Sequence, residues 1–405
     1  MREILLKDIC DLDNGYAFKS SDYIDESNTL NCRMSNIRPD GTFDILYNAK
    51  YLPDDYAVKY KSYALKDGDL IIAMTDMAND PKILGVPTVV KTQGYNLLLN
   101  QRVGKLRFTK SGVDSKYLKY ALQSTKVRNY LKRFAGGGLQ INVSKKDILS
   151  IPIILRSEEE QNAISELLDR ILLIVERQKN ELELLDELIK ARFVEMFGDT
   201  EHNSNDYIQL RLGDVCDLQN GYAFKSGDYV DSSNVNNCRM SNIRPDGGFD
   251  SDYSPKYLPD DFWDRYSAYR LYDGDVIIAM TDMASDPKIL GVPTIVKSNG
   301  KKFLLNQRVG KLVFSDNEQF NRVFLMRFLS QNYIRKNLAK KAGGSTQINV
   351  GKPAILDIGI LKPPIDSQNQ FASFVQQVDK SKVAVQKSLD EAQLLFDSLM
   401  QQYFG

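Results

Sequence analysis

Side chains with planar hydrogen-bonding groups gather in a polar turn that this chain carries twice. The turn and its copy, residues 31–41 and 237–247, are identical and contain Arg33, Asn36, Arg38, Arg239, Asn242 and Arg244. Arginine can bind guanine through two hydrogen bonds, and asparagine can bind adenine in the same way. These residue types could therefore read base edges, although capping the turn or facing solvent is the simpler role for any one of them.

Other polar residues repeat in the same manner and extend the candidate surface. A second polar loop lies between two predicted strands. A Gln-Arg pair forms a third polar cluster, and one further lysine follows an aromatic segment. The candidates in these segments are Lys19, Thr75, Lys82, Gln101 and Arg102 in the first copy and Lys225, Thr281, Lys288, Gln307 and Arg308 in the second. Their charges and amides suit phosphate oxygens as well as base edges.

Two glycine-rich segments follow helices that carry several basic residues. They span 136–142 and 343–349, and their polar candidates for nucleic-acid contact are Gln140, Asn142, Gln347 and Asn349. Backbone amides of a glycine loop can bind phosphate oxygens, but glycines after a helix are equally typical of a plain helix end. No lysine follows at the spacing of a nucleotide-binding P-loop.

The sequence offers one weak pattern for metal-dependent catalysis. Residues 53–54 with 80–82, and 259–260 with 286–288, read Pro-Asp and Asp-Pro-Lys, similar to the paired carboxylates and lysine of metal nucleases. The pattern is short, and its central proline fits poorly in a strand. The single histidine, His202, excludes sites that need two, and four cysteines without a Cys-x-x-Cys pair predict buried thiols. We therefore predict no catalytic residue and no metal, with a metal-dependent nuclease as an alternative.

The most informative feature of the chain is a long internal repeat. Residues 10–106 align without a gap with residues 216–312, and 70 of the 97 positions are identical. Two near-copies on one chain usually give a molecule with an approximate two-fold axis, which engages a target of the same symmetry. The commonest such target is double-stranded DNA.

Each copy is predicted to consist of a mixed domain followed by a long helix. Strands are predicted at 69–73, 86–91 and 103–108, and helices at 115–134 and 319–339. The fold class is therefore α+β, with two repeated mixed domains and two long helices. The predicted divisions are a mixed domain at 1–156, a central helix at 157–198, a linker at 199–206, a second mixed domain at 207–364 and a C-terminal helix at 365–405.

The two long helices are predicted to pair through an apolar seam. Apolar residues recur at alternating steps of four and three, a pattern that is typical of a coiled coil. The seam residues are Ile164, Leu168, Ile171, Val175, Leu182, Leu185 and Ile189 in the first helix and Phe371, Val375, Val378, Val385, Leu389 and Phe396 in the second. The short linker favours an antiparallel pair related by an approximate two-fold axis. Two separate helices, each packed on its own domain, are the alternative.

The formal net charge of the chain is zero, which at first argues against a nucleic-acid-binding protein. The charge is uneven, because residues 158–197 carry a net charge of −6 and residues 366–405 carry −2. The mixed domains therefore carry the positive charge without forming a strong basic patch, and a partner protein could supply much of the phosphate contact. No leader peptide or membrane-spanning apolar run is recognisable, so we expect a cytoplasmic protein.

At this point the chain resembles a known family. Residues 15–20 and 221–226, both Gly-Tyr-Ala-Phe-Lys-Ser, look like the opening of the target recognition domains in specificity subunits of type I restriction–modification systems. The Gln-Ile-Asn-Val run in each glycine-rich segment, and the prolines at 152 and 363–364, fit the same pattern. The helix end at 191–199 is similar to the family's central spacer helix. The resemblance covers the whole chain.

The resemblance implies a non-enzymatic subunit in which each target recognition domain reads one half of a bipartite DNA site. The paired helices would set the gap between the halves and dock two adenine-N6 methyltransferase subunits, which restriction subunits can join. S-adenosylmethionine, ATP and magnesium would bind those partners, and no cofactor would bind this chain. A non-catalytic coiled-coil adaptor is the second alternative to this function.

One departure from the family pattern is informative. The family's two recognition domains commonly differ and read unlike half-sites, whereas the candidate readers of this chain are identical in both copies. We therefore expect two equal half-sites on opposite strands, which together form an interrupted palindrome. The differences Ile45/Ser251, Leu46/Asp252 and Ala57/Trp263 could break this symmetry.

Overall fold

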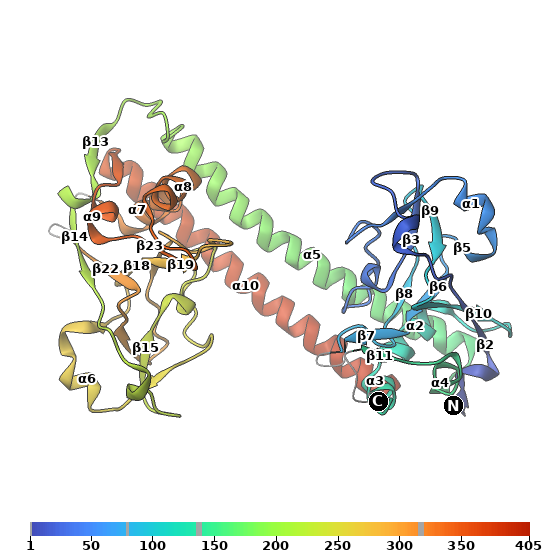
Figure 1. Ribbon diagram of the computed structural model, residues 1–405. Coiled ribbons are helices and arrows are strands. Elements are labelled where there is room, and N and C mark those ends of the chain that lie inside the picture. Colours follow the sequence, from blue (N-terminus) through green and yellow to red (C-terminus); the bar gives the residue numbers. More distant parts are fainter. Residues whose placement is uncertain (1, 78–80, 135–139, 315–319) are drawn as a thin grey trace. The chain divides into compact units, whose positions relative to one another are not determined.

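The computed structural model describes residues 2–77, 81–134, 140–314 and 320–405, which form two compact units. Unit 1 consists of Met1–Asn180 with Gln386–Gly405, and unit 2 consists of Glu181–Val385. Each unit contains a mixed domain of strands and short helices, together with one half of each long helix (Figure 1).

The two units have the same order of elements. Unit 1 contains β1 (Arg2–Leu5), β2 (Cys10–Asn14), β3 (Thr29–Cys32), β4 (Tyr51–Leu52), α1 (Tyr56–Lys59), β5 (Ala64–Leu65), β6 (Leu70–Ala73), β7 (Thr75–Met77), β8 (Pro87–Val89), β9 (Asn96–Leu99), β10 (Val103–Phe108), α2 (Ser115–Gln123), α3 (Thr125–Lys132), β11 (Gln140–Asn142), α4 (Lys145–Leu149) and β12 (Pro152–Leu155). Unit 2 contains β13 (Ile208–Arg211), β14 (Cys216–Asn220), β15 (Val235–Cys238), β16 (Tyr257–Leu258), α6 (Phe262–Arg265), β17 (Arg270–Leu271), β18 (Val276–Ala279), β19 (Thr281–Met283), β20 (Pro293–Ile295), β21 (Lys302–Leu305), β22 (Val309–Phe314), α7 (Arg322–Leu329), α8 (Asn332–Lys341), β23 (Gln347–Asn349), α9 (Lys352–Leu356) and β24 (Gly359–Lys362). The long helices are α5 (Glu158–Phe197) and α10 (Ile365–Phe404).

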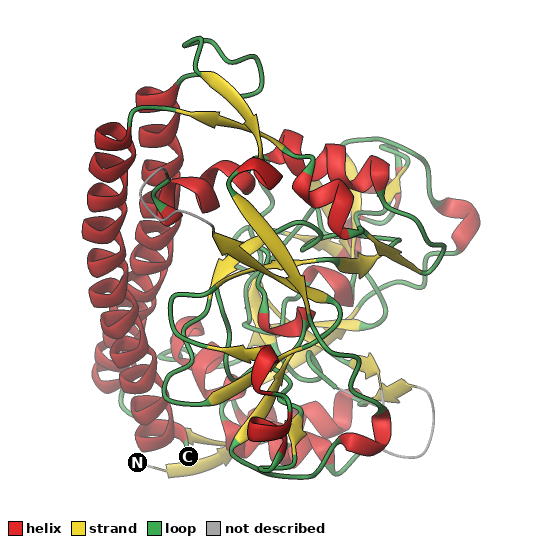
Figure 2. Cartoon of the chain, turned by 90° about the vertical axis from the view of Figure 1, so that its left-hand side faces the viewer, coloured by secondary structure: helices red, strands yellow, loops and turns green. Residues whose placement is uncertain are grey.

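Two four-stranded sheets form the body of each mixed domain (Figure 2). In unit 1 the sheet β2-β10-β6-β8 is antiparallel throughout, whereas the sheet β4-β3-β9-β5 contains the parallel pair β3 and β9. The parallel register pairs Thr29 with Asn96 and Cys32 with Leu99. The strand pairs β1–β12 and β7–β11 complete the domain, and unit 2 repeats every one of these pairings. The predicted α+β fold with two repeated mixed domains is confirmed.

Strand β6 contributes side chains to two apolar clusters, one on each face of its sheet. Its four residues, Leu-Ile-Ile-Ala, are all buried, as expected for a strand that is covered on both faces. Leu70 and Ile72 pack with residues of β2, β10 and α2, whereas Ile71 and Ala73 pack with residues of β3 and β9. Strand β18 divides its side chains between two clusters in the same way in unit 2.

The helix predicted at 115–134 is two helices in the structure. Ser124 separates α2 from α3, because it adopts an extended conformation and its hydroxyl oxygen accepts the Val127 N–H. A serine at this position caps the helix that follows it. The helix predicted at 319–339 is likewise divided into α7 and α8.

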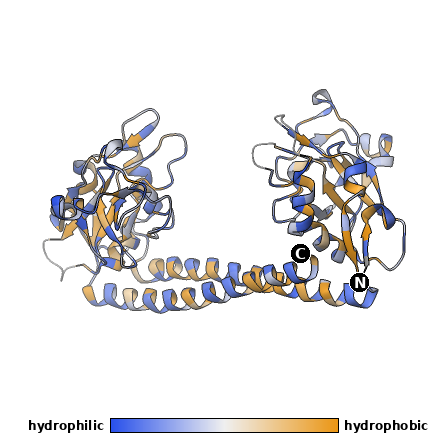
Figure 3. Cartoon of the chain, turned by 90° about the horizontal axis from the view of Figure 1, so that it is seen from below, coloured by the Kyte–Doolittle hydropathy of each residue, from blue (hydrophilic) through white to orange (hydrophobic). Residues whose placement is uncertain are grey.

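The long helices pack against each other in antiparallel directions within each unit. In unit 1 the first half of α5 meets the end of α10, where Leu168 lies in one cluster with Leu399 and Phe404. In unit 2 the second half of α5 meets the start of α10, and the ring centroids of Phe193 and Phe371 are 5.4 Å apart. Apolar and polar positions alternate along both helices (Figure 3), and all the predicted seam residues are buried or half-buried. The predicted antiparallel pairing is confirmed.

Two polar residues interrupt the seam near its middle. Gln178 donates a hydrogen bond to the Ser388 hydroxyl at 2.5 Å in unit 1, and Lys382 forms an ion pair with Asp186 at 2.8 Å in unit 2. A polar residue at such a position favours one register of a coiled coil over others, at some cost in stability. None of the helices in the described ranges has a stretch long and apolar enough to cross a membrane.

A buried glutamine ties the start of each long helix to the mixed domain of its unit. Gln161 is 1 % exposed; its amide nitrogen donates to the Gly112 carbonyl, and its oxygen accepts the Asp114 N–H at 3.0 Å. Gln368 makes the matching contact with the Asn321 N–H at 2.9 Å. A buried amide has to be hydrogen-bonded, so this contact fixes the direction in which each helix leaves its domain. No pattern in the sequence indicated this role.

Replacing Phe197 by alanine is expected to lower the free energy of unfolding of unit 2 by about 3–5 kcal/mol, because the buried ring leaves a large cavity. The ring packs against Phe193 and Phe324, with centroids 5.1 and 4.7 Å away. Chemical denaturation followed by circular dichroism measures the change. The control is Val194→Ala on the exposed side of α5, which should change the stability by less than about 0.5 kcal/mol. Equal effects of the two substitutions would contradict this packing.

Candidate nucleic-acid interface

The parallel pairing of β3 with β9 brings three candidate residues to one edge of the sheet. Arg33 follows β3 directly, and Gln101 and Arg102 follow β9 after one further residue. The Asn100 N–H bonds the Cys32 carbonyl at 3.0 Å, which holds the two strand ends side by side. We call these groups the strand-end clusters: Arg33, Gln101 and Arg102 in unit 1, and Arg239, Gln307 and Arg308 in unit 2.

The Gln-Arg pairs of the strand-end clusters are open to solvent. Gln101 and Arg102 are exposed, as are Gln307 and Arg308, and no side-chain hydrogen bond or ion pair engages them within the described part of the chain. Arg239 is half-buried and donates to the carbonyl of its neighbouring loop at 2.7 Å. Amide and guanidinium groups at the surface are available to an external partner.

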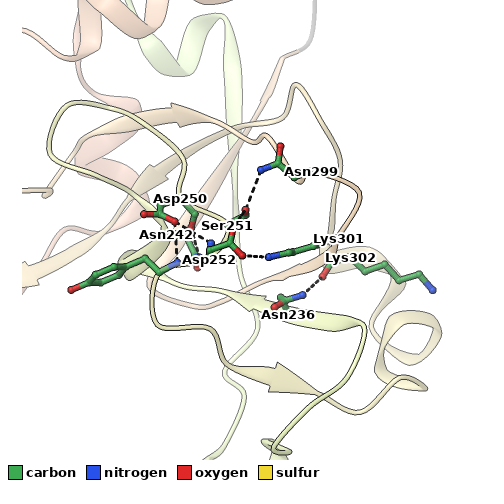
Figure 4. Close-up of polar contacts among 9 residues, drawn as sticks. Asn236, Asn242, Asp250, Ser251, Asp252, Asn299, Lys301 and Lys302 are labelled. Atoms are coloured by element: carbon green, nitrogen blue, oxygen red, sulfur yellow. Dashed lines mark hydrogen bonds and ion pairs between the residues drawn. The ribbon is translucent and has the colours of Figure 1, made fainter. Parts of the chain in front are cut away.

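Asn36 supports the turn that carries Arg33. It is 3 % exposed; its amide nitrogen donates to the Asp44 carbonyl at 2.9 Å, and its oxygen accepts the Arg33 N–H at 2.8 Å. In unit 2, Asn242 donates to the Asp250 carbonyl at 2.8 Å in the same way (Figure 4). Both ends of the amide are therefore used inside the turn, whereas the sequence predicted a base contact for this residue.

Arg38 is stacked on an aromatic ring. Its guanidinium carbon lies 3.7 Å from the centroid of the Tyr47 ring, and that of Arg244 lies 4.4 Å from the centroid of Tyr253. Stacking on an aromatic face orients a guanidinium group, while its N–H edges stay open for hydrogen bonds. In both units the stacked ring therefore restricts the orientation of this guanidinium group.

The β7–β11 strand pair holds another group of candidates. Thr75 is buried, and its hydroxyl donates to Asn142 Oδ1 at 2.7 Å; Thr281 and Asn349 are joined in the same way at 2.6 Å. Gln140 and Asn142 are exposed on β11. Thr75 therefore fixes the orientation of an exposed amide and is itself withdrawn from the surface.

The second glycine-rich segment folds back on β23. The Gly343 N–H bonds the Asn349 carbonyl at 3.1 Å, and the Asn349 N–H bonds the Gly343 carbonyl at 2.9 Å. The Gly343 amide is therefore not free for a phosphate oxygen. Residues 136–138 of the first glycine-rich segment lie outside the described residues.

A buried carboxylate shapes the polar loop after β7. Asp76 is 5 % exposed and accepts the N–H groups of Met77, Ile83 and Leu84 at 2.7, 2.5 and 2.9 Å. Asp282 makes the same three bonds in unit 2. Lys82 and Lys288, the lysine candidates that directly precede the bonded Ile83 and Ile289, are exposed.

The described carboxylates of the metal-nuclease pattern are not grouped as metal ligands. Asp54 accepts the Asn28 N–H at 3.1 Å, and Asp286 forms an ion pair with Lys288 at 3.1 Å. Within the described ranges no three Asp, Glu, His or Cys side chains are grouped so that they could hold a metal ion. Asp80 lies outside the described residues.

The cysteines and the histidine show no sign of activation. All four cysteines are free and buried, as predicted, and burial raises the pKa of Cys10, Cys32 and Cys216 to about 12. Such thiols stay protonated and unreactive at neutral pH. His202 pairs with Asp199 at 2.7 Å on the surface, and this hydrogen bond raises the pKa of His202.

Some of the sequence differences between the two copies lie at the opposite end of the β3–β9 sheet. Near the start of these strands, Leu30 and Leu97 of unit 1 pack with Ile45 in an apolar cluster. The counterparts in unit 2 are Asn236, Phe303 and Ser251. Phe303 still packs in an apolar cluster, with its ring centroid 5.3 Å from that of Phe249, so unit 2 loses only the apolar contacts of Leu30 and Ile45.

A polar network replaces these apolar contacts in unit 2 (Figure 4). Asn299 donates to the Ser251 hydroxyl at 3.2 Å, and Lys301 pairs with Asp252. These substitutions compensate one another, because the new polar groups bind each other and the sheet keeps its register. No residue of the strand-end clusters differs between the copies.

Comparison with known proteins assigns the chain to a family. The family model of the type I restriction modification DNA specificity domain matches residues 1–184 and 205–392. The chain therefore belongs to this family, whose specificity subunits are not themselves catalytic, and the resemblance found in the sequence is confirmed. The chain is 30 % identical over 190 residues to the specificity subunit of the type I restriction enzyme MjaVIII from Methanocaldococcus jannaschii. That match covers 46 % of this chain and 43 % of the relative, which is less than half of the relative's length.

Solved structures with the same fold come from the same class of protein. The S subunit of a type I restriction–modification system from M. genitalium gives a TM-score of 0.57 at 14 % identity, covering 100 % of this chain and 96 % of that one. A chain solved in a study of complex assembly and conformational transition of the type I system gives 0.53 at 17 % identity, covering 100 % and 97 %. At these identities the likeness shows the fold alone.

Replacing Asp76 by alanine is expected to destabilise unit 1 by roughly 2–5 kcal/mol, because buried N–H groups lose their acceptor. Asp282→Ala should destabilise unit 2 to the same extent, since its hydrogen bonds are the same. Urea denaturation measures both losses. The control is Asp25→Ala, an exposed aspartate whose removal should change the stability by less than about 0.5 kcal/mol. A loss confined to one unit would contradict the equivalence of the two loops.

Proposed function

We propose that this chain is the DNA-recognition subunit of a type I restriction–modification complex and that each unit reads one half of a bipartite site. The observation that carries the proposal is the strand-end cluster of each unit, with its exposed and unengaged Gln-Arg pair. Arginine and glutamine are side chains that bind guanine and adenine through two hydrogen bonds. The stacked Arg38 and the exposed Asn142 are further candidates for contact in the same domain.

We further propose that the two half-sites are equal. The strand-end residues, the stacked arginine with its tyrosine, and the Thr-Asn pair are identical in the two copies. The differences at the other end of the sheet exchange one internal packing arrangement for another. Equal readers in two copies favour equal half-sites on opposite strands, and hence an interrupted palindrome.

The partners of this proposal follow from family membership. The recognition domains comprise residues 1–156 and 207–364, and the paired helices set the distance between the half-sites. The helices also dock two adenine-N6 methyltransferase subunits, through which restriction subunits join the complex. S-adenosylmethionine, ATP and magnesium bind those partners and not this chain. The formal net charge of zero suits such a shared interface, because the partners supply part of the phosphate contact.

Reactions with purified subunits test this function. The chain alone, with or without magnesium, should neither cut nor methylate duplex DNA. It should direct adenine-N6 methylation to one sequence when its methyltransferase subunit and S-adenosylmethionine are added. Cleavage by the chain alone that Asp286→Ala abolishes would support the nuclease alternative. Methylation without any sequence preference would support the adaptor alternative.

Matched substitutions in the two units test the equality of the half-sites. Arg102→Ala and Arg308→Ala should each cost about 1–3 kcal/mol in binding and relax the preference for one base pair, at the same place in the two half-sites. The double variant should lose binding free energy equal to about the sum of the two single losses, because the two residues lie in separate units. Competition titrations with duplexes altered at single base pairs measure the effects. Preferences that relax at unlike places in the two half-sites would contradict equal reading.

A further inference from the structure

We propose that each unit also holds one phosphate of the DNA backbone in a cluster of two tyrosines and one cation. The cluster consists of Tyr16, Lys59 and Tyr60 in unit 1 and of Tyr222, Arg265 and Tyr266 in unit 2. We call these the tyrosine–cation clusters. The inference rests on the proposed DNA recognition and adds to it a contact that positions the duplex without reading its sequence.

The geometry brings two hydroxyls and a positive charge together. The ring centroids of Tyr16 and Tyr60 are 4.6 Å apart, and those of their counterparts in unit 2 are 4.5 Å apart. A hydrogen bond between the Tyr16 and Tyr60 hydroxyls raises the pKa of Tyr16. Lys59 Nζ lies 5.2 Å from the Tyr60 centroid, and the Arg265 guanidinium carbon lies 5.6 Å from the Tyr266 centroid. Hydroxyl donors and a cation are the side-chain groups that bind phosphate oxygens in protein–DNA interfaces.

The tyrosine–cation cluster lies directly beside the strand-end cluster. Tyr16 forms an isolated parallel bridge with Asn100, and its carbonyl accepts the Gln101 N–H at 3.0 Å. In unit 2 the Tyr222 carbonyl accepts the Gln307 N–H, also at 3.0 Å. A phosphate held here would flank the bases that the strand-end cluster reads. Backbone contacts in such positions fix the register of a protein on the duplex.

The two copies keep a positive charge at the end of this helix, although the rest of the helix differs. Helix α1 reads Tyr-Ala-Val-Lys and helix α6 reads Phe-Trp-Asp-Arg, so all four residues differ. The cation at the last position is nevertheless kept, as Lys59 or Arg265, and the tyrosine that follows it is identical. Two residues after Lys59, by contrast, Lys61 is replaced by Ser267. In both units this cation also lies over the ring at the start of its helix, 5.0 Å from the Tyr56 centroid and 5.6 Å from the Phe262 centroid, so the same site is formed by different helix sequences.

The local charge suits a single phosphate. Lys59 and Lys19 are exposed, and attraction to Tyr60 raises the pKa of Lys59, so this amine is charged at neutral pH. Two carboxylates lie nearby: Asp22 accepts the Lys19 N–H at 2.6 Å, and Asp55 precedes α1. The surface is therefore nearly balanced in charge, which suits one phosphodiester better than an extended polyanion.

The salt dependence of DNA binding tests the cluster. With the full chain in complex with its methyltransferase subunit, Lys59→Gln should lower the slope of log Kd against log salt by about 0.9, the value for one phosphate contact. Arg265→Gln should do the same, and the double variant should lose about twice as much. Lys59→Arg, which copies unit 2, should keep the wild-type slope. The methylated sequence should stay the same in every variant, because a phosphate contact carries no base information.

Lys61→Ser is the matched control, since it removes one positive charge two residues away and unit 2 already carries the serine. Equal slopes for Lys61→Ser and Lys59→Gln, or a changed methylation sequence in Lys59→Gln, would overturn the cluster as a phosphate site. The slope can be measured on duplex DNA that lacks the recognition sequence, so the test does not depend on sequence reading. A wild-type complex that binds DNA without sequence preference would overturn the proposed function alone, and one that binds no DNA would overturn both.

Discussion

The parallel pairing of β3 with β9 is the constraint on which each unit depends. Both strands run in the same direction, so the residues that follow them meet at one edge, although they are far apart in the sequence. An antiparallel pair would have placed the same residues at opposite edges. Strand β6 holds this sheet against the antiparallel one, because its side chains are buried on both faces. The edge that carries Arg33 and Arg102 is therefore backed by the core of the domain.

The two copies act as a comparison within one molecule. At the end of the sheet where β3 and β9 begin, apolar contacts in one copy are exchanged for a polar network in the other, and the fold tolerates the exchange. At the other end no strand-end residue changes. Either arrangement can stabilise the domain, because the apolar side chains of one are buried and the polar side chains of the other are hydrogen-bonded. The strand-end residues are identical in both units although the packing at the other end of the sheet differs.

The sequence predicted what depends on periodicity and repetition, and it missed what depends on tertiary contacts. The seam of the long helices follows from the spacing of apolar residues, and the short linker between helix and domain favoured the antiparallel direction. The role of Asn36 was not, because only the folded turn shows that its amide is consumed by backbone groups. No sequence pattern singled out Gln161, which the fold buries against the domain. The break at Ser124 was missed because apolar residues continue on both sides of it.

The central claim is that two identical reading edges recognise two identical half-sites. A map of N6-methyladenine at base resolution tests it most directly, in a methylation-free host that expresses this chain with its methyltransferase subunit. The account predicts one interrupted palindrome that is modified on both strands. A bipartite sequence with two unlike halves would contradict it.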